Sequence, residues 1–300
     1  MPELPDVALY LEALEARTVG ARLEQIRLAS PFVLRSFEPP LEAAAGRTVL
    51  GLRRVGKRIV FALSEDLFLS IHLMIAGRFR WKEAGTKIPG KLGLAGFDFS
   101  TGTLLLTEAS QKKRAAIHLL RGESSLRALD AGGIEPLEAT VEQYAAALRR
   151  ENHTIKRSLT DPRLFAGIGN AYSDEILHRA RMSPLRLTRR MSDLEIEGLR
   201  TATQATLIVW IERLRQDTGD RFPEKVTAFR PEMAVHGRFR QPCPVCATPV
   251  QRIVHAENES NYCPTCQTKG KLLADRALSR LLRGDWPKSL AELEEMKSRG

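Results

Sequence analysis

The sequence predicts an α+β protein, with an N-terminal helix plus β-sandwich domain and a C-terminal helical domain that carries a four-cysteine zinc ribbon. Three patterns support this fold class. Apolar residues recur at helical spacing in residues 3–18, short alternating or continuous apolar runs fill 22–120, and helical spacing returns over 138–216. Four cysteines then lie together between residues 243 and 266. We therefore expect two domains with a small metal-binding appendage.

Breaks in these patterns set the expected domain boundaries. Gly132, Gly133 and Pro136 mark the first boundary, because glycine and proline interrupt regular structure. Residues 217–241 contain further glycines and prolines with little periodicity, which predicts a loop or linker. The expected domains are a catalytic helix and sandwich over 1–130, a helical DNA-binding domain over 138–230, a zinc finger with a closing helix over 235–283, and a charged tail over 284–300.

Charge and composition limit the class of protein. The chain has 46 Lys and Arg against 36 Asp and Glu, a formal net charge of +10, which favours a polyanionic partner such as nucleic acid. No apolar run approaches the roughly 18–20 residues that span a membrane. Glu3 and Asp6 also argue against a secretion signal at the N-terminus. We expect a cytoplasmic monomer without a membrane partner, associated with the nucleoid if the source is bacterial.

The cysteines form the strongest local motif. Cys243-Pro-Val-Cys246 and Cys263-Pro-Thr-Cys266 are separated by sixteen residues. Two such knuckles can supply four thiolates to one tetrahedral zinc ion, and a closed shell of this kind is structural. Catalysis must therefore lie elsewhere in the chain. Nearby cations such as Arg252 favour a hairpin that contacts phosphates.

A second motif precedes a predicted helix. Gly167-Ile-Gly169-Asn170 leads into a helical run that starts at Ala171. Glycines at this place let backbone amides approach an anion at the positive end of the helix. An ordinary tight turn between helices is the alternative interpretation. Lys156 upstream shifts the balance toward a phosphate backbone.

The first residues, MPELPDV, form a third motif. Pro5 and Asp6 suit the first turn of a helix. This interpretation does not explain Pro2 and Glu3.

Taken together, the three motifs resemble the formamidopyrimidine-DNA glycosylase and endonuclease VIII family of base-excision enzymes. MPELPDV is similar to the start of that family, residues 161–172 to its helix–two-turn–helix segment, and residues 235–267 to its C-terminal zinc finger. The resemblance implies a DNA glycosylase with abasic-site lyase activity that excises damaged, oxidised bases from DNA and holds a structural zinc ion. The alternative is a damaged-DNA-binding protein of the same family that is catalytically weak or inactive.

The resemblance also implies catalytic roles. Removal of Met1 would leave Pro2 with a secondary amine that attacks C1′ of the damaged nucleotide, and an α-amino group has a pKa near 7.7–8.0, so part of it is neutral at pH 7. Glu3 would be the general acid, although it also suits a helix N-terminus. Lys57 matches a family lysine that donates protons and contacts the lesion or a phosphate. Its alternative role is a solvated member of a charge run.

Other segments are similar to the family's DNA-contacting loops. In residues 71–78, strict register puts Ile75 in the place of the void-filling methionine, with Met74 one residue earlier, and either could fill the gap left by a flipped base. Residues 107–115 offer a basic cluster where the family has an arginine and a phenylalanine wedge. The expected DNA-binding residues are Met74, Ile75, Arg78, Lys112, Lys113, Arg114, Lys156, Asn170, Tyr172, Arg252, Asn258 and Asn261.

Two departures from the family pattern bear on specificity. Asn258 stands five residues before Cys263, where the family has an arginine, which leaves β- and β,δ-elimination open. Residues 217–224 are short and polar where purine-specific members have a lesion-capping loop. The short segment predicts a more open pocket that favours oxidised pyrimidines, ring-opened purines or bulky adducts over 8-oxoguanine.

Overall fold

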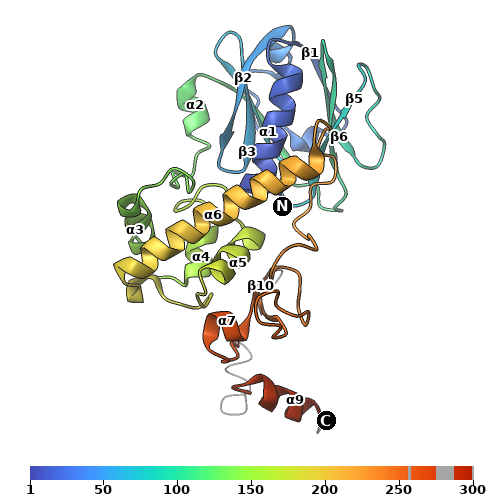
Figure 1. The fold of residues 1–300 in the computed structure, drawn as a ribbon. Coiled ribbons are helices and arrows are strands. Elements are labelled where there is room, and N and C mark those ends of the chain that lie inside the picture. Colours follow the sequence, from blue (N-terminus) through green and yellow to red (C-terminus); the bar gives the residue numbers. More distant parts are fainter. Residues whose placement is uncertain (256–257, 275–286, 299–300) are drawn as a thin grey trace. The chain divides into compact units, whose positions relative to one another are not determined.

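The computed structural model describes residues 1–255, 258–274 and 287–298 and divides the chain into two compact units. Unit 1 comprises Met1–Gly133 and Ile208–Ala228, and unit 2 comprises Ile134–Leu207 and Phe229–Gly300. The division falls inside one long helix, α6 (Asp193–Thr218). Figure 1 labels the elements along the chain.

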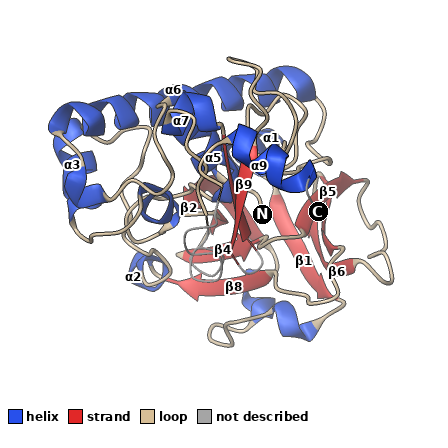
Figure 2. Cartoon of the chain, turned by 90° about the horizontal axis from the view of Figure 1, so that it is seen from below, coloured by secondary structure: helices blue, strands red, loops and turns tan. Residues whose placement is uncertain are grey.

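Unit 1 is built from one long helix and an antiparallel sheet of eight strands in the order β5-β7-β6-β1-β2-β3-β4-β8. β1 and β2 pair through only two residue pairs, so the sheet bends there into two layers. Phe61 and Leu69 of one layer share a buried core with Phe97 and Leu104 of the other, which confirms the predicted sandwich. Figure 2 shows the strands of this unit in red. The elements are α1 (Leu4–Thr18), β1 (Arg22–Leu28), β2 (Arg47–Val55), β3 (Arg58–Leu63), β4 (Leu67–His72), β5 (Gly77–Lys82), β6 (Gly93–Phe99), β7 (Gly102–Glu108), β8 (Ala116–Arg121) and α2 (Glu123–Arg127), with single 3₁₀ turns at Pro31–Val33 and Leu41–Ala44.

Helix α1 fixes the N-terminus against the sandwich. Val7, Tyr10 and Leu14 lie one turn apart and are fully buried in its core. The Tyr10 ring meets Phe79 of β5 edge-on, with the ring centroids 5.4 Å apart. The predicted helix over 3–18 is therefore confirmed to within one residue, and its first turn cannot fray without disturbing the core.

Unit 2 contains the remaining helices and a hairpin. Thr140 caps the start of α3 with a capping box, in which the backbone N–H of Gln143 donates to Thr140 Oγ1 at 3.3 Å. Residues 219–241 form no helix or strand, whereas the first two residues of the loop or linker predicted over 217–241 still belong to α6. The elements are α3 (Val141–Arg149), α4 (Ile155–Thr160), α5 (Asn170–Arg179), a 3₁₀ turn at Thr188–Arg190, α6, β9 (Gln251–His255), β10 (Asn258–Tyr262), α7 (Pro264–Thr268) and α9 (Leu290–Ser298).

The structure describes only part of the C-terminal region for which the sequence predicted a closing helix and a charged tail. The closing helix expected near 272–282 falls mostly on residues 275–286, which lie outside the described residues. The expected charged tail contains a helix, α9. None of the described helices is long and apolar enough to cross a membrane.

Candidate active site and nucleic-acid interface

The N-terminal residues of unit 1 are buried rather than loose. Pro2 is buried, and Glu3, just before α1, exposes 3% of its surface. The backbone N–H of Glu3 donates to Asp6 Oδ2 at 3.0 Å. This bond and the proline at the second helical position fix where α1 begins. The three residues that precede the helix are therefore held in one place.

The electrostatic surroundings of the N-terminus suit an amine nucleophile. Burial lowers the pKa of the Met1 α-amino group. Among the neighbouring charges, Glu3 raises that pKa and Arg78 lowers it, and Asp6 and Lys57 add weaker effects in opposite directions. An amine at this position is more often neutral, and so more nucleophilic, than one in water.

Lys57 lies beside this cluster, in the turn between β2 and β3. Gly56 precedes it with a φ of +58°, a left-handed conformation that glycine adopts without strain. Burial lowers the pKa of Lys57, and the nearby Glu3 carboxylate raises it less. The structure thus brings the three predicted catalytic residues, Pro2, Glu3 and Lys57, into one region of unit 1.

The β4–β5 loop presents the two candidate void-filling residues differently. Met74 has a φ of +51°, is half-buried, and its sulfur contacts the His72 ring. Ile75 is 52% exposed. The loop closes tightly, since a Cβ on Gly77 would lie 2.2 Å from the Leu73 carbonyl oxygen. Ile75 is therefore the side chain that this loop offers to solvent.

Arg78, at the start of β5, donates hydrogen bonds to backbone carbonyl groups of the protein. Its Nη1 donates to the Gly77 carbonyl at 2.7 Å, and its Nε donates to the Val226 carbonyl. Arg78 therefore links β5 to the segment that follows α6, and both belong to unit 1.

The basic loop after β7 is anchored by a residue that the sequence did not single out. The buried Glu108 carboxylate accepts hydrogen bonds from the backbone N–H groups of Arg114 at 2.9 Å and Ala115 at 3.1 Å. Lys113 donates to the Glu108 carbonyl, whereas Lys112 and Arg114 have exposed side chains. An acid placed between an apolar strand and a basic loop was the signal that could have identified Glu108.

A buried network in unit 2 contains three of the residues that were expected from the sequence to contact DNA. Lys156 is 8% exposed, and its Nζ donates to the Asn170 carbonyl and to Asp174 Oδ1, both at 2.6 Å. Tyr172 and Asn261 are each 1% exposed. Burial keeps these side chains from the surface in this conformation, because they pack α5 into unit 2. Asn170 is half-buried and is the first residue of α5.

Two acids on α5 bind residues 234–236, just before the zinc finger, and Asn261 of β10. Asp174 Oδ2 lies 2.8 Å from His236 Nδ1 and accepts from Asn261 Nδ2 at 3.3 Å. Glu175 accepts three backbone N–H groups, those of residues 234, 235 and 236, at 2.8–3.0 Å. Burial raises the pKa of Glu175 against the effect of these bonds. Sequence reasoning missed both acids, although two consecutive acids in a predicted helix were a visible signal.

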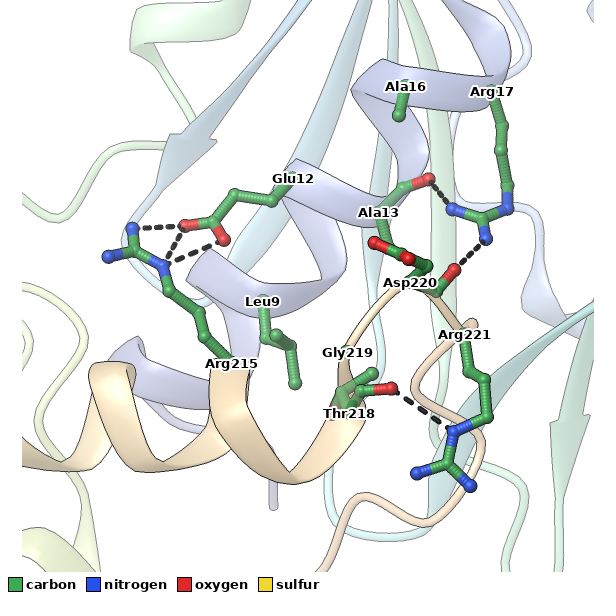
Figure 3. A pocket seen from close by; sticks show the side chains of 10 residues that line it. All are labelled: Leu9, Glu12, Ala13, Ala16, Arg17, Arg215, Thr218, Gly219, Asp220 and Arg221. Atoms are coloured by element: carbon green, nitrogen blue, oxygen red, sulfur yellow. Dashed lines mark hydrogen bonds and ion pairs between the residues drawn. The ribbon is translucent and has the colours of Figure 1, made fainter.

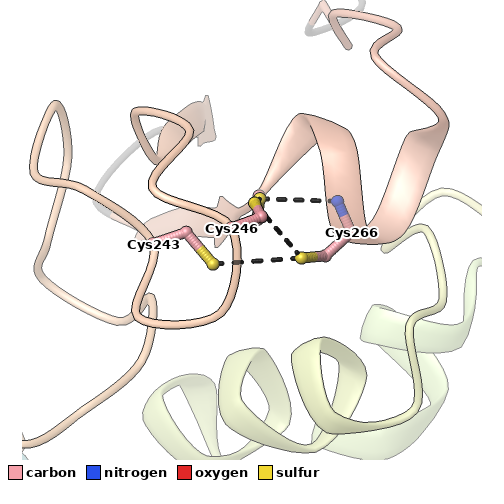
Figure 4. Close-up of side chains that lie close together, drawn as sticks. Cys243, Cys246 and Cys266 are labelled. Atoms are coloured by element: carbon pink, nitrogen blue, oxygen red, sulfur yellow. Dashed lines mark hydrogen bonds between the residues drawn. The ribbon is translucent and has the colours of Figure 1, made fainter.

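The four cysteines come together as predicted. Their sulfur atoms all lie within 4.8 Å of one another, and Figure 4 shows Cys243, Cys246 and Cys266 converging. The Cys246–Cys263 and Cys243–Cys266 sulfur distances are 3.4 and 3.9 Å. Four sulfurs at this separation fit one tetrahedral Zn²⁺ with Zn–S bonds of about 2.3 Å.

Of the other two finger residues predicted to bind DNA, the structure describes the side-chain contacts of Arg252 but not those of Asn258. Arg252 on β9 pairs with Glu259 of β10 at 3.1 Å and covers the Phe239 ring at 4.4 Å. It is therefore already engaged with the hairpin. The side chain of Asn258 lies outside the described part of the chain.

A pocket of 510 Å³ lies elsewhere in unit 1, between the later turns of α1 and the end of α6 (Figure 3). Arg215 Nε donates to Glu12 Oε2 at 2.9 Å, and Arg17 Nη2 donates to the Asp220 carbonyl at 3.0 Å. Arg221 donates to the Thr218 carbonyl at 3.2 Å. The lining arginines thus bind protein acceptors, and the pocket is separate from the N-terminal cluster.

Three family models match the chain in succession. The formamidopyrimidine-DNA glycosylase N-terminal domain matches residues 1–124, and the H2TH domain of the same enzymes matches residues 133–220. A zinc finger found in these enzymes and in isoleucyl-tRNA synthetases matches residues 240–269. With the sandwich, the helical unit and the cysteine cluster, these matches define a zinc-finger DNA-repair protein.

Whole-chain comparisons specify the family. The formamidopyrimidine-DNA glycosylase of Pelotomaculum thermopropionicum is 33% identical over 89% of this chain and 99% of its own length, and that of Solibacter usitatus is 32% identical over 90% and 100%. The chain belongs to the formamidopyrimidine-DNA glycosylase family, whose members are DNA glycosylases of base-excision repair.

Solved structures agree with this assignment. The Thermus thermophilus enzyme superposes with a TM-score of 0.75 at 29% identity, covering 89% of this chain and 98% of that one. The Lactococcus lactis enzyme, bound to DNA with an abasic site, gives a TM-score of 0.76 at 26% identity, covering 89% and 99%.

Proposed function

We propose that this chain is a bifunctional DNA glycosylase and abasic-site lyase that uses the Pro2 amine as its nucleophile. The observation that carries the proposal is the buried N-terminus, where burial lowers the pKa of the α-amino group beside Glu3 and Lys57. Removal of Met1 would transfer this environment to the Pro2 nitrogen. Family membership and the DNA-bound Lactococcus lactis structure support DNA as the substrate.

The proposed reaction proceeds in two stages. The Pro2 nitrogen attacks C1′ of the damaged nucleotide, the base departs as it takes up a proton, and Glu3 protonates the deoxyribose ring oxygen as the ring opens. The resulting iminium acidifies the C2′ hydrogens. Loss of a C2′ proton then expels the 3′-phosphate by β-elimination, and hydrolysis of the iminium frees Pro2.

Lys57 assists through its unusual environment. Because burial lowers its pKa, Lys57 exchanges protons closer to neutral pH than an exposed lysine does. In its charged form it attracts a phosphate next to the lesion. Both roles need it near the nucleophile, which is consistent with its effect on the N-terminal amine.

The finger is proposed to hold one structural Zn²⁺ through Cys243, Cys246, Cys263 and Cys266. The ion would cross-link the two knuckles and hold the β9–β10 hairpin. The other proposed DNA contacts are Ile75 or Met74 as the void filler, the exposed Lys112 and Arg114, and Asn170 at the start of α5.

Departures from the family pattern bear on which lesions are excised, and the net charge bears on where the protein works. With only a short, polar segment at residues 217–224, we propose excision of oxidised pyrimidines, ring-opened purines or bulky adducts. With Asn258 in the finger, we propose that the reaction ends at β-elimination. We further propose a monomer that works in the bacterial nucleoid, in line with the net charge of +10.

A weak or inactive damaged-DNA-binding protein is the second candidate. The missing phenylalanine and finger arginine favour it, since both changes affect how the opposite strand and the lesion are held. The ion pair between Arg252 and Glu259 further reduces the free cations of the finger.

Trapping with sodium borohydride separates the two candidates. Protein shown by mass spectrometry to begin at Pro2 is mixed with oligonucleotides that carry an abasic site or a panel of oxidised bases. The first candidate predicts a covalent protein–DNA adduct, which Pro2→Gly reduces and retention of Met1 abolishes. Binding without any adduct across the panel would favour the second candidate, and undiminished trapping in Pro2→Gly would deny Pro2 its role.

A further inference from the structure

One face of the sandwich carries buried polar atoms that the proposed chemistry does not use. Arg58 Nη1 on β3, Ser70 Oγ on β4 and His118 Nδ1 on β8 are each buried and have no hydrogen-bond partner in the described part of the chain. Such atoms are rare in folded proteins, because an unmade hydrogen bond is not compensated by water. Three of them on neighbouring strands leave this part of the sandwich with unmet hydrogen-bonding capacity.

The strand register places these side chains together. Ser70 lies directly opposite His118, and Arg58 lies directly opposite His72 one row along. Opposed residues in a sheet share a face, and residues two apart in one strand do as well. The four side chains therefore project from the face opposite the core-facing Leu69 and Ile71.

Arg35 extends this row at the edge of the sheet. Leu34 forms a parallel bridge with Ile117, and the Arg35 N–H donates to the Ile117 carbonyl at 2.8 Å. Because Leu34 packs against the core, Arg35 projects from the face that carries His118. Burial lowers the pKa of His118, and the charges that lower it further are those of Arg58 and Arg35.

Cations and histidines thus continue from the catalytic region to the sheet edge. Burial lowers the pKa of His72 to about 4, and the charges of Arg58 and Lys57 and the neighbouring His118 lower it further. The row therefore runs from Lys57 through His72, Arg58 and His118 to Arg35, all within unit 1.

Two exposed aromatic side chains flank Arg35. Phe32 is 79% exposed and Phe37 is 80% exposed. Proteins that bind single-stranded nucleic acid combine positively charged side chains, which neutralise its phosphates, with aromatic rings, on which its unpaired bases stack. A duplex would satisfy the cations but hides the faces of its bases.

We propose that this face binds single-stranded DNA that continues from the lesion-bearing strand. Arg58, His118 and Arg35 contact its backbone phosphates, and Phe32 and Phe37 stack with unpaired bases. The inference rests on the proposed function, since it extends the same strand away from Lys57. It names the substrate class as lesions flanked by unpaired DNA, such as those at a fork or a gap.

The test compares the affinity of the full-length protein for two DNA probes by fluorescence anisotropy. Both are duplexes with a tetrahydrofuran abasic analogue, which cannot be cleaved through C1′, and one carries an unpaired dT tail on the lesion strand. The double substitution Phe32→Ala/Phe37→Ala should weaken binding to the tailed probe about tenfold and leave the blunt probe within about twofold. Leu50→Ala, which removes another exposed apolar side chain of unit 1, should change neither.

Salt dependence tests the phosphate contacts separately. Arg35→Gln should lower the slope of log affinity against log salt on the tailed probe by about 0.7, the value for one phosphate contact on a single strand. Arg127→Gln is the control, since its side chain is 79% exposed and pairs within α2.

Equal effects of the aromatic double substitution on both probes would overturn the proposal, and so would no effect on either probe. Neither measurement requires catalysis. Failure of wild-type protein to form a borohydride adduct would therefore refute the lyase activity while the preference for the tailed probe is still measured.

Discussion

Each unit of this protein places a lysine near a buried carboxylate, and the two lysines are held differently. Lys57 in unit 1 lies near Glu3, but burial outweighs that attraction and lowers the lysine pKa. Lys156 in unit 2 donates to Asp174 at 2.6 Å, and Asp174 in turn bonds His236. The first arrangement favours proton exchange, whereas the second fixes a structure. The sequence alone presents both as lysines in basic runs.

Loss of the cysteine cluster is expected to have the largest effect, and it tests whether the two units are independent. Cys243→Ser or a zinc chelator should unfold the finger, because structural zinc contributes about 10–16 kcal/mol in small finger domains. Hydrogen exchange should show lost protection in β9 and β10, with β3 and β4 unchanged, and added zinc should reverse the chelator's effect. Lost protection in β3 or β4 would show that the units are not independent.

Removal of the Asp174 carboxylate, which contacts both Lys156 and His236, tests the structural role of Lys156. Asp174→Ala should lower the free energy of unfolding of unit 2 by about 3–5 kcal/mol, since it leaves a buried lysine and His236 without their partner. Asp193→Ala removes a carboxylate that is 85% exposed and pairs with Arg149, and should cost less than about 1 kcal/mol. Urea unfolding followed by circular dichroism measures both. Equal losses would remove the distinction between the two kinds of lysine.

Loss of the other lysine should affect rate rather than stability. Lys57→Met should lower the single-turnover rate on abasic DNA about 100-fold, because proton transfer near the nucleophile is lost. Its free energy of unfolding should not fall, since a buried amine is replaced by an apolar chain of similar length. Lys87→Met, at an exposed lysine of the same unit, is the control. A Lys57→Met protein that unfolds more easily and reacts normally would assign Lys57 to structure.

The smallest predicted effect is a pH dependence in unit 1. His72 has a pKa of about 4 in the folded protein, against about 6.5 when unfolded, so the unfolded chain binds more protons between these values. The free energy of unfolding should therefore fall as pH drops from 7 to 5, by about 1–2 kcal/mol. His72→Gln should show a correspondingly weaker fall in urea midpoints. An identical pH dependence in the variant would mean that His72 titrates normally.

Features encoded by neighbouring residues could be predicted from the sequence. Helix α1 follows from apolar spacing and a proline near its start, and the cysteine cluster follows from two short knuckles. The sandwich follows from alternating runs with glycine breaks. In each case the pattern and the contact that it predicts involve the same few residues.

Features that depend on distant contacts could not. The burial of Asn261 arises from its bond to Asp174, 87 positions away. Tyr172 was expected to contact DNA from its resemblance to the family motif, and the structure packs it inside unit 2. The row from Arg58 to Arg35 depends on strand register and an edge bridge, and sequence periodicity specifies neither. Where Met74 and Ile75 point depends on the shape of one loop.

Unit 1 is discontinuous in sequence, and this has a consequence for synthesis. Residues 208–228 return to it, where Phe222 packs near Tyr10 and the Val226 carbonyl accepts from Arg78. Arg78 is one of the charges that act on the N-terminal amine. A nascent chain therefore cannot complete the surroundings of its own first residues until the first segment of unit 2, residues 134–207, has left the ribosome. The reactive end of the molecule, made first, is finished only after helices α3, α4 and α5 of the other unit have been synthesised.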